Sequence, residues 1–406
     1  MITIYIAEYH RFGGSQRAML GCVRELMARG EEVQVVFPGR GTATEWFERA
    51  GVPLVVLATP PSLNQFGGAV LRAGVMGKAR TTLAAAHHSY QVYRLMKASK
   101  SKVLHCNTTR STLMAAAVPR LLRLRTVWHM RAQAHAAGPL VHRLCVLLSS
   151  DRIAICEDSL SELPKSALER TVVIYDGVDV EACRVRAAAS PADLNGRCDG
   201  GSPTSGALCM VASLTPFKGQ HRLLEAVALL RDVHGLQPCV FLIGSASPTS
   251  HVEVQYEAYL RDRSSELGLR HVHFLGWLDD PLPWVAACDL LVLPSLSHDR
   301  IVLDGRDVEV RGGEAFPAVV LEAMALSRPV VATRNAGIPE QVKQGVTGVL
   351  VDQRSDLQLA DAVASLLRDN EARTRLGLAG AARVEAQFSR ALTIDGLVDL
   401  YRRISA

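Results

Sequence analysis

The amino-terminal half of this chain lacks acidic residues over a long stretch, with none between Glu48 and Asp151. Residues 1–182 hold 22 Lys and Arg against 14 Asp and Glu, a net charge of +8, and the remaining residues hold 23 against 26, a net charge of −3. A surface with such an excess of positive charge favours binding to an anionic partner or to an anionic membrane surface. An ordinary basic surface would leave the same pattern. No recognisable nucleic-acid motif accompanies the basic residues, so we do not expect nucleic acid as a partner.

The sequence also lacks any apolar run long enough to span a bilayer. Its start, Met1 to Ala7, is typical of a buried strand and has no basic segment or small-residue cleavage site of a signal peptide. The nine cysteines are scattered, with no Cys-x-x-Cys, which predicts reduced packing residues in a cytoplasmic protein. No spacing of metal ligands is evident, so we expect neither a metal nor a cofactor.

Short β-rich runs alternate with amphipathic segments through 406 residues, a length that suits two domains. This rhythm predicts an α/β protein with two doubly wound, Rossmann-like domains that face each other across a cleft. We expect the amino-terminal domain at 1–183 and a linker rich in small and polar residues at 184–206. The carboxy-terminal domain is expected at 207–388, followed by a helix at 389–406 that packs back onto the first domain.

Two carboxylates, Glu314 and Glu322, bracket a short apolar segment that we expect to open a helix. Pro317 suits the first helical position, and the amides of Ala318 and Val319 then point outward at the positive end of the helix dipole. Such a helix start suits phosphate. Acids beside a phosphate site are better placed for sugar hydroxyls than for the phosphate, which would repel them. The alternative is a buried helix start with ordinary acidic residues.

Three further turns lead from a predicted strand into a predicted helix. Gly13-Gly14 allows close backbone approach to a ligand, although many such turns hold two glycines. Lys218 ends the turn that follows the strand Ala207–Ala212, where its ammonium group can neutralise a diphosphate. A surface lysine is the alternative. The turn from Arg334 to Glu340 can supply backbone to the same ligand, or it is plain helix capping.

These motifs together resemble the retaining glycosyltransferases of family four, which have the GT-B fold. The second half carries the closer match, in the segments Val211-Ala-Ser-Leu…Phe-Lys218-Gly, Val272-His-Phe-Leu-Gly276, Cys288-Asp289-Leu-Leu-Val-Leu-Pro294-Ser295, Glu314-Ala-Phe-Pro-Ala-Val-Val-Leu-Glu322, Arg328-Pro-Val-Val-Ala-Thr and Gly337-Ile-Pro-Glu340…Gly345-Val-Thr-Gly348. The first half matches more loosely, in Gly13-Gly14, Val127-Trp-His129-Met-Arg131 and Ile174-Tyr-Asp-Gly177-Val-Asp179. The resemblance extends over nearly the whole chain.

The resemblance implies a role for each matching residue. Glu314 would contact the donor sugar, Glu322 the ribose hydroxyls, and Lys218 the diphosphate, whose departure it would assist. Gly13 and Gly14 would approach the diphosphate from the other domain. Lys218, Glu314 and His129, the histidine near the reacting sugar, form the implied catalytic set. The remaining implied donor-binding positions are Ser213, Leu278, Phe316, Pro317, Ala318 and Val319. The family is metal-independent, and the nucleotide-sugar is a substrate rather than a cofactor.

The chain departs from the family pattern in three places. The family usually has an arginine where Ser213 stands, and Arg17, Arg131 and Arg334 are candidates to replace that charge. The usual asparagine before Gly-Val-Asp is Asp176, which we interpret as a tolerated turn substitution. The third departure is the long stretch Leu296–Gly313, interpreted as an extra charged loop beside the donor site, either a lid or specificity element or a harmless surface insertion.

The predicted function is the transfer of a sugar from a nucleotide-diphosphate donor to a glycan, lipid-linked or small-molecule acceptor, with retention of the anomeric configuration. The basic amino-terminal domain would bind the acceptor, and an anionic membrane surface on the cytoplasmic side is a candidate partner. A nucleotide-sugar epimerase of the same architecture is one alternative. A binding protein with a degenerate donor site is the other, and Ser213 is its main support.

Overall fold

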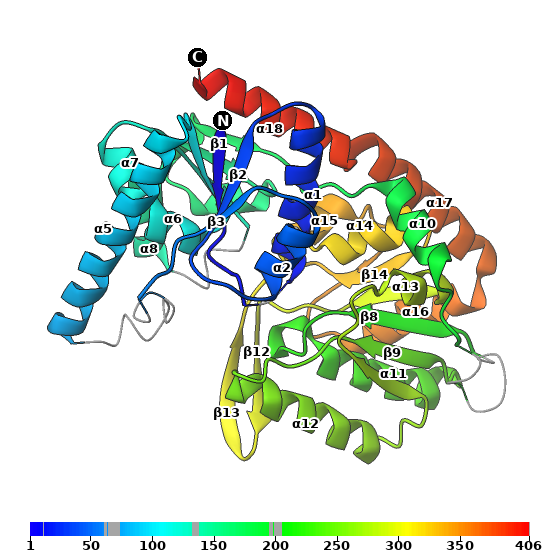
Figure 1. Cartoon of the computed structure of the whole chain (residues 1–406). Coiled ribbons are helices and arrows are strands. Elements are labelled where there is room, and N and C mark those ends of the chain that lie inside the picture. The colour runs from blue at the N-terminus through cyan, green and yellow to red at the C-terminus, as the bar shows by residue number, and fades with distance from the viewer. Residues whose placement is uncertain are drawn as a thin grey trace. The chain divides into compact units, whose positions relative to one another are not determined.

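The computed structural model describes residues 1–10, 12–60, 63, 74–131, 138–194, 198 and 205–405. The chain divides into two compact units, unit 1 at Met1–Asp176 with Arg390–Ala406 and unit 2 at Gly177–Ser389. Each unit holds one parallel sheet with helices on both faces (Figure 1). The predicted pair of doubly wound domains is therefore confirmed.

Unit 1 contains a seven-stranded parallel sheet with the order β3-β2-β1-β4-β5-β6-β7. Its strands are β1 (Ile2–Tyr5), β2 (Val33–Phe37), β3 (Leu54–Val56), β4 (Val103–Cys106), β5 (Arg125–Met130), β6 (Asp151–Ala154) and β7 (Thr171–Val173). The described helices are α1 (Gly14–Ala28), α2 (Thr42–Arg49), α5 (Val75–Ala98), α6 (Thr109–Ala115), α7 (Ala117–Leu121), α8 (Pro139–Leu148), η2 (Asp158–Glu162), α9 (Lys165–Leu168) and α18 (Arg390–Ser405).

The alternation of side chains along a buried strand divides the core of unit 1 into two layers. Ile2 and Ile4 face one layer, together with residues of α1 and of the final helix α18 such as Leu397. Tyr5 faces the other layer, together with residues of α5 and α6 such as Val92. Strands buried on both faces explain why the sequence shows nearly continuous apolar runs rather than an alternating pattern.

Unit 2 contains a six-stranded parallel sheet with the order β10-β9-β8-β11-β14-β15. Its strands are β8 (Ala207–Val211), β9 (Cys239–Ile243), β10 (Val272–Gly276), β11 (Leu290–Leu293), β14 (Val330–Thr333) and β15 (Gly348–Val351). Its described helices are α10 (Val180–Ala189), η3 (Pro216–Lys218), α11 (Gln220–His234), α12 (His251–Glu266), α13 (Leu282–Ala287), α14 (Ala318–Ala325), α15 (Ile338–Gln341), α16 (Asp356–Arg368) and α17 (Asn370–Gln387). Among the described helices of the whole chain, none combines the length and the apolar character needed to cross a membrane.

The stretch Leu296–Gly313 is not a loop. It forms the antiparallel hairpin of β12 (His298–Leu303) and β13 (Arg306–Arg311), which Figure 1 shows extending from the sheet of unit 2. Its turn is Asp304-Gly305, and both residues have positive φ angles of 49° and 69°. Asp-Gly is a preferred pair for a two-residue hairpin turn, because both positions of such a turn need a positive φ. Buried and exposed residues alternate along β12, as expected for a strand with one covered face.

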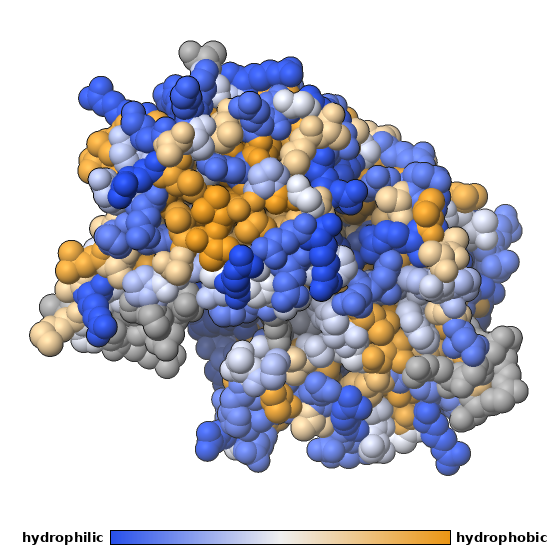
Figure 2. Space-filling model, in the orientation of Figure 1, coloured by the Kyte–Doolittle hydropathy of each residue, from blue (hydrophilic) through white to orange (hydrophobic). Residues whose placement is uncertain are grey.

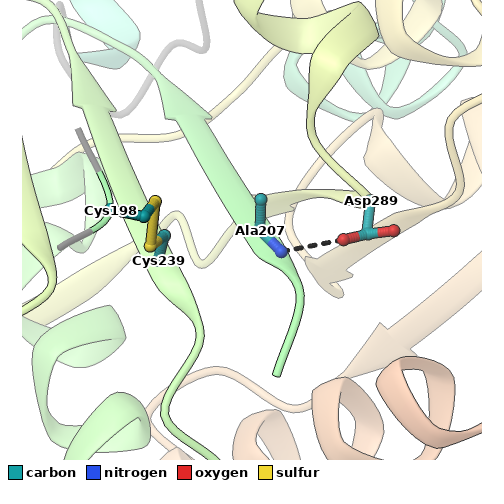
Figure 3. Close-up of a disulfide and its surroundings, with 4 residues drawn as sticks. All are labelled: Cys198, Ala207, Cys239 and Asp289. Atoms are coloured by element: carbon teal, nitrogen blue, oxygen red, sulfur yellow. Dashed lines mark hydrogen bonds between the residues drawn. A yellow bond between two sulfur atoms is a disulfide. The ribbon is translucent and has the colours of Figure 1, made fainter. Parts of the chain in front are cut away.

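Two observations differ from expectation near the start of unit 2. The segment expected to begin a linker at residue 184 lies inside α10. Farther on, Cys198 and Cys239 form a disulfide beside the start of β9 (Figure 3), whereas all nine cysteines were expected to be reduced. The two residues are 41 positions apart, so their pairing depends on the fold and leaves no motif in the sequence. The seven other cysteines are buried and do not belong to the disulfide.

Candidate functional site

Lys218 is placed by a short 3₁₀ turn between β8 and α11. The turn ends at Gly219, whose φ of 80° is left-handed. A Cβ at this position would lie 2.1 Å from the carbonyl oxygen of Pro294, at the end of β11. Only glycine can combine this positive φ with such a close approach to the Pro294 carbonyl oxygen. The turn is therefore pressed against the carboxyl end of the central strands, where ligands of doubly wound sheets bind.

The Lys218 ammonium group forms an ion pair with a carboxylate oxygen of Glu314. The hydroxyl of Ser295, just after β11, donates to the same oxygen at 3.0 Å. The Glu314 side chain is 8% exposed and that of Lys218 is 18% exposed, so the pair is largely shielded from water. The sequence predicted both residues as site members, and the structure brings them into contact.

The backbone of Glu314 is also fixed. Its amide donates to the side-chain oxygen of Asn335 at 3.3 Å, and its carbonyl oxygen accepts from the amide of Gly337 at 3.3 Å. The hydroxyl of Thr333, at the end of β14, donates to the carbonyl oxygen of Ser295 at 2.5 Å. These contacts join the turns that follow β11 and β14, so Glu314 is held by the rigid end of the sheet rather than by a free loop.

Helix α14 begins four residues after Glu314, with one difference from expectation. Pro317 is the N-cap with an extended ψ of 118°, and Ala318 is the first helical residue. The carbonyl oxygen of Pro317 accepts from the Gln341 side chain at 3.1 Å. Ala318 and Val319 are both half-buried and supply first-turn amides, which a helix leaves without an intrahelical acceptor. Positive charge from the dipole therefore lies beside the Lys218–Glu314 pair.

Glu322 lies one turn farther along α14 and is half-buried. Its charge acts on Arg186 of α10, a helix that packs against α14. Arg186 binds Asp280 through two hydrogen bonds of 2.8 and 2.9 Å. Burial by itself would lower the pKa of the Arg186 guanidinium, but Asp280 and Glu322 raise it overall. Arg186 was not predicted as part of the site, and its own sequence neighbourhood carries no motif.

The hairpin of β12 and β13 is anchored to the turn that carries Lys218. Arg222 of α11 donates to both carboxylate oxygens of Asp299 at 2.8 and 3.0 Å. A Cβ on Gly312 would lie 2.4 Å from the Phe217 ring, so the hairpin base packs directly on the residue before Lys218. The amide of Leu296 donates to the carbonyl oxygen of Phe217 at 2.7 Å. The base of the hairpin therefore holds in place both the segment that leads into Glu314 and the turn that carries Lys218.

Asp299 carries its negative charge over a wide pH range. Burial by itself would raise the pKa of its carboxyl group, but hydrogen bonds from His221, Arg222 and the Arg300 amide lower it strongly. The His221 ring lies 3.2 Å from a carboxylate oxygen of Asp299. This charged anchor was missed in the sequence because its members come from α11 and from a segment taken for a loop.

The structure also shows where the other predicted site residues of unit 2 lie. The carbonyl oxygen of Ser213 accepts from the Gln220 side chain at 2.9 Å, which shapes the turn before Lys218. Phe316 is buried, and its ring meets that of Phe388 edge-on, so its side chain belongs to the core. Leu278 is half-buried directly after β10. Arg334 pairs with Asp352 at 3.6 Å and is about half exposed, which leaves it able to move toward an anion.

Gly13 and Gly14 lie at the start of α1 in unit 1, where Gly13 is the N-cap. Its amide donates to the side-chain oxygen of Gln16 at 3.1 Å. Gly14 is exposed, and a Cβ built on it would meet nothing within 4 Å. Packing within the described residues therefore does not require glycine at position 14, whereas close approach of a ligand to the backbone would.

His129 is fully buried in β5 and belongs to a chain of three side chains. Its Nδ1 lies 3.1 Å from Nε2 of His105, and Nδ1 of His105 lies 2.6 Å from the hydroxyl of Tyr401 on α18. Burial, with the charge of Arg131, lowers the pKa of His105 to about 3 and that of His129 well below its ordinary value. Both rings are neutral at pH 7, so each carries one proton and the tautomer of one fixes that of the other.

Nε2 of His129 has no hydrogen-bond partner among the described residues. If Tyr401 donates to His105, the chain of bonds leaves a proton on Nε2 of His129, and if Tyr401 accepts, it leaves a lone pair there. A neutral hydrogen-bonding atom is thus available at this position. The spacing of 296 residues between His105 and Tyr401 means that no local motif could have revealed the arrangement.

Arg131 does not lie open to replace the charge missing at Ser213. Its side chain is 4% exposed and forms an ion pair with Asp176. It also donates to the side-chain oxygen of Asn107 at 2.8 Å. Asp176, interpreted from the sequence as a turn substitution, therefore serves to neutralise a buried arginine. The third candidate, Arg17 of α1, lies with its guanidinium 5.7 Å from the centre of the Phe12 ring.

Comparison with known proteins matches both units. The family described as Glycosyl transferases group 1 matches residues 201–383, and the Glycosyl transferase 4-like domain matches residues 13–159. The lipopolysaccharide core biosynthesis glycosyltransferase LpsE of Rhizobium meliloti is 32% identical over 45% of this chain and 46% of its own length. A GDP-mannose-dependent phosphatidylinositol monomannoside mannosyltransferase of Mycobacterium tuberculosis is 34% identical over 59% of this chain and 57% of its own length. The matches thus span about half the length of these relatives.

The fold matches solved structures over the whole chain. Anabaena Alr3699/HepE, crystallised with UDP-glucose, superposes with a TM-score of 0.77 at 21% identity and covers 99% of both chains. Sucrose-phosphate synthase from Thermosynechococcus elongatus superposes with a TM-score of 0.74 at 16% identity, over 99% of this chain and 98% of its own. The two matched domains, together with this shared GT-B fold, identify the chain as a member of the group 1 glycosyltransferases that resembles family 4.

Proposed function

We propose that this protein transfers a sugar from a nucleotide-diphosphate donor to an acceptor, with retention of the anomeric configuration and without a catalytic metal. The observation that carries the proposal is the contact of Lys218 with Glu314 beside the first turn of α14, with Glu322 one turn farther along. Cationic, amide and carboxylate groups at one edge of a doubly wound sheet suit a ligand with both phosphates and hydroxyls.

In this proposal Lys218 leaves Glu314 when the donor binds and turns to the diphosphate. The bond between the anomeric carbon and the diphosphate oxygen breaks, and an acceptor hydroxyl oxygen forms a bond to that carbon on the same face while its proton passes to the diphosphate oxygen. The negative charge that develops on the diphosphate oxygen is met by the ammonium group and the α14 amides. Glu314 is then released to accept hydrogen bonds from the sugar, and Glu322 accepts them from the ribose. His129 presents a neutral Nε2 toward the reacting sugar, as the resemblance to family 4 implies.

We further propose an acceptor that is a glycan or a lipid-linked glycan, reached by unit 1 at an anionic membrane surface. Support comes from the exposed faces of α5, α7 and α8, which combine apolar and basic residues. The exposed apolar residues are Met76, Leu83, Tyr90, Leu121, Leu140, Leu144 and Leu147. Exposed basic residues on the same three helices are Lys78, Arg80, Arg94, Lys97, Arg120 and Arg143. Figure 2 shows hydrophobic and hydrophilic residues interspersed on the side of unit 1 that carries α5 and α7.

A panel of UDP-, GDP- and ADP-sugars, with mass spectrometry of nucleotide release and of the sugar, tests the transfer. We expect release from one donor class to depend on acceptor and to continue when a chelator is added. Conversion of the donor into an isomeric nucleotide-sugar without any acceptor would instead support an epimerase. Binding of a nucleotide without turnover, under any acceptor tried, would support a non-catalytic binding protein.

Vesicle flotation at low salt tests the membrane surface. We expect the protein to float with vesicles that contain phosphatidylglycerol and not with pure phosphatidylcholine, because exposed basic residues attract anionic lipid. Replacing Arg80 and Leu83 by serine should reduce flotation, while Val233→Ser, at an exposed apolar position of α11 in unit 2, is the matched control. Equal and weak binding to both kinds of vesicle would contradict this part of the proposal.

A further inference from the structure

Two cysteines and a histidine meet in unit 2, away from the candidate donor site. Cys239 opens β9, and His273 is the second residue of β10. His273 is paired with Phe241 in the parallel register, and Cys239 precedes Phe241 by two residues. Because side chains alternate along a strand, the side chains of Cys239, Phe241 and His273 face the same side of the sheet. Cys198, which precedes β8 in the chain, completes the group (Figure 3).

The group lies at the opposite end of the strands from the residues discussed above. Lys218 and Glu314 follow the carboxyl ends of β8 and β11, whereas Cys239 stands at the amino end of β9. The amide of Ala207, which opens β8 next to β9, donates to Asp289 at 2.8 Å at this same end (Figure 3). The three side chains therefore do not belong to the donor site.

The surroundings fix the group in place. Cys198 and Cys239 are 5% and 2% exposed. The His273 ring stacks on Phe241 with ring centres 5.2 Å apart, and Phe241 in turn lies 5.1 Å from the ring of Trp284 on α13. Both sulfur atoms and a ring nitrogen of His273 lie within 4.8 Å of one another. Such spacing suits three ligands of a tetrahedral ion, for which metal–sulfur and metal–nitrogen distances are about 2.3 and about 2.0–2.1 Å.

We propose that Cys198, Cys239 and His273 form a redox-controlled zinc site, which binds Zn²⁺ when the cysteines are reduced and closes as a disulfide when they are oxidised. Two thiolates and an imidazole are ligands that zinc prefers among abundant divalent ions. The fourth tetrahedral position is taken by water. Either state ties Cys198 to the start of β9, under both oxidising and reducing conditions.

The two states are related by a balanced exchange. A dithiol reductant attacks the Cys198–Cys239 bond, forms a mixed disulfide and leaves as its own cyclic disulfide. Two electrons and two protons pass to the protein, which then holds two thiols. Zinc binding displaces both thiol protons, because only thiolates ligate the ion. Oxidation by a disulfide of the same class releases zinc and restores the Cys198–Cys239 bond.

Cobalt substitution tests the site without reference to sugar transfer. The full chain is reduced with a phosphine, freed of it without air, and titrated with Co²⁺ while the thiolate-to-cobalt and tetrahedral d–d absorption bands are recorded. We expect one equivalent of Co²⁺ to bind, zinc to displace it, and the oxidised protein to give no bands. Under denaturing conditions the thiol count should be seven when oxidised and nine when reduced.

Variants identify the ligands. His273→Gln keeps both cysteines and should lower zinc affinity by at least about tenfold, since losing a ligand costs no less than losing a residue that orients one. Cys209→Ala removes a buried free cysteine of β8 and should bind as the wild type. The proposal is overturned if the reduced wild type shows no more absorption than a Cys198→Ser/Cys239→Ser double variant. It is equally overturned if Cys209→Ala loses the bands or His273→Gln leaves affinity unchanged.

Discussion

Six strands follow the same order in both units, and unit 1 adds β7 at the edge, but the polar groups beside the central strands differ. Unit 2 places ions there, in the pairs Lys218–Glu314 and Arg222–Asp299. Unit 1 places a neutral chain there, from His129 through His105 to Tyr401, beside the buried ion pair of Arg131 and Asp176. In the proposed function the same fold would support two kinds of chemistry, charge for a phosphate ligand in unit 2 and a neutral hydrogen bond for an uncharged reacting group in unit 1.

Low pH should destabilise unit 1 more than unit 2, and this is the largest effect that we expect. Buried histidines that stay neutral when folded bind fewer protons than the unfolded chain, so their contribution to stability falls as pH drops below about 6.5. At about 1.4 kcal/mol per pH unit, His105 costs up to about 3 kcal/mol at pH 4.5, and His129 adds to this cost in the same direction. Asp299 has a lowered pKa, so its contribution is lost only at lower pH, below the ordinary value of 3.8.

Hydrogen exchange read by mass spectrometry, corrected for intrinsic rates, measures this difference peptide by peptide. We expect peptides of β4 and β5 to lose protection at pH 4.5 while those of β8 and α11 retain it. Replacing His105 and His129 by glutamine should remove the difference in pH dependence, if the double variant folds at pH 7. Loss of protection in unit 2 before unit 1 would contradict the contrast between charged and neutral interiors.

Lys218→Ala should give the next largest effect. Removing one preorganised donor to a developing negative charge lowers kcat by about 10²–10³-fold, equivalent to about 2.7–4 kcal/mol. Lys343→Ala, at an exposed lysine of the same unit, is the control and should be silent. Steady-state kinetics with the donor identified by the panel provide the measurement. If both variants behave alike, the charge assigned to unit 2 is not used in catalysis.

Tyr401→Phe probes the neutral chain of unit 1. It leaves Nδ1 of His105 buried without its partner, which should lower the free energy of unfolding by about 1–3 kcal/mol. Urea unfolding measures the loss, and Tyr90→Phe, at an exposed position of α5, should change little. The tautomer of His129 is also released, so nitrogen NMR of the imidazoles should show a changed balance between Nδ1 and Nε2 protonation. An unaltered spectrum would mean that Tyr401 does not set the tautomer.

Asp299→Asn should have the smallest effect of the four. It replaces a carboxylate that holds Arg222 through both oxygens, but Arg222 is 25% exposed, so water screens the loss and the cost is about 1–2 kcal/mol. Asp304→Asn, in the hairpin turn, keeps a residue that tolerates positive φ and serves as the control. Thermal unfolding compares them. Equal stability of the two variants would show that the hairpin is not anchored through Asp299.

The parts of this picture that could be predicted from the sequence are those with local signals. Alternating strands and helices gave both sheets, and the run from Glu314 to Glu322 gave the helix start to within one residue at Pro317. The hairpin had a signal that was overlooked, since Asp304-Gly305 stands between alternating buried and exposed residues. The disulfide and the chain from His105 to Tyr401 join residues far apart in sequence, so only the folded topology reveals them.

Calorimetric titration with UDP, GDP and ADP tests the central claim most directly, because it asks whether unit 2 binds a nucleoside diphosphate at the residues named. The account predicts one binding equivalent for one of the three nucleotides. It also predicts weaker binding by Glu322→Ala, through the ribose, and by Lys218→Ala, through the diphosphate. Absence of binding by all three nucleotides, or an unchanged affinity in both variants, would contradict it.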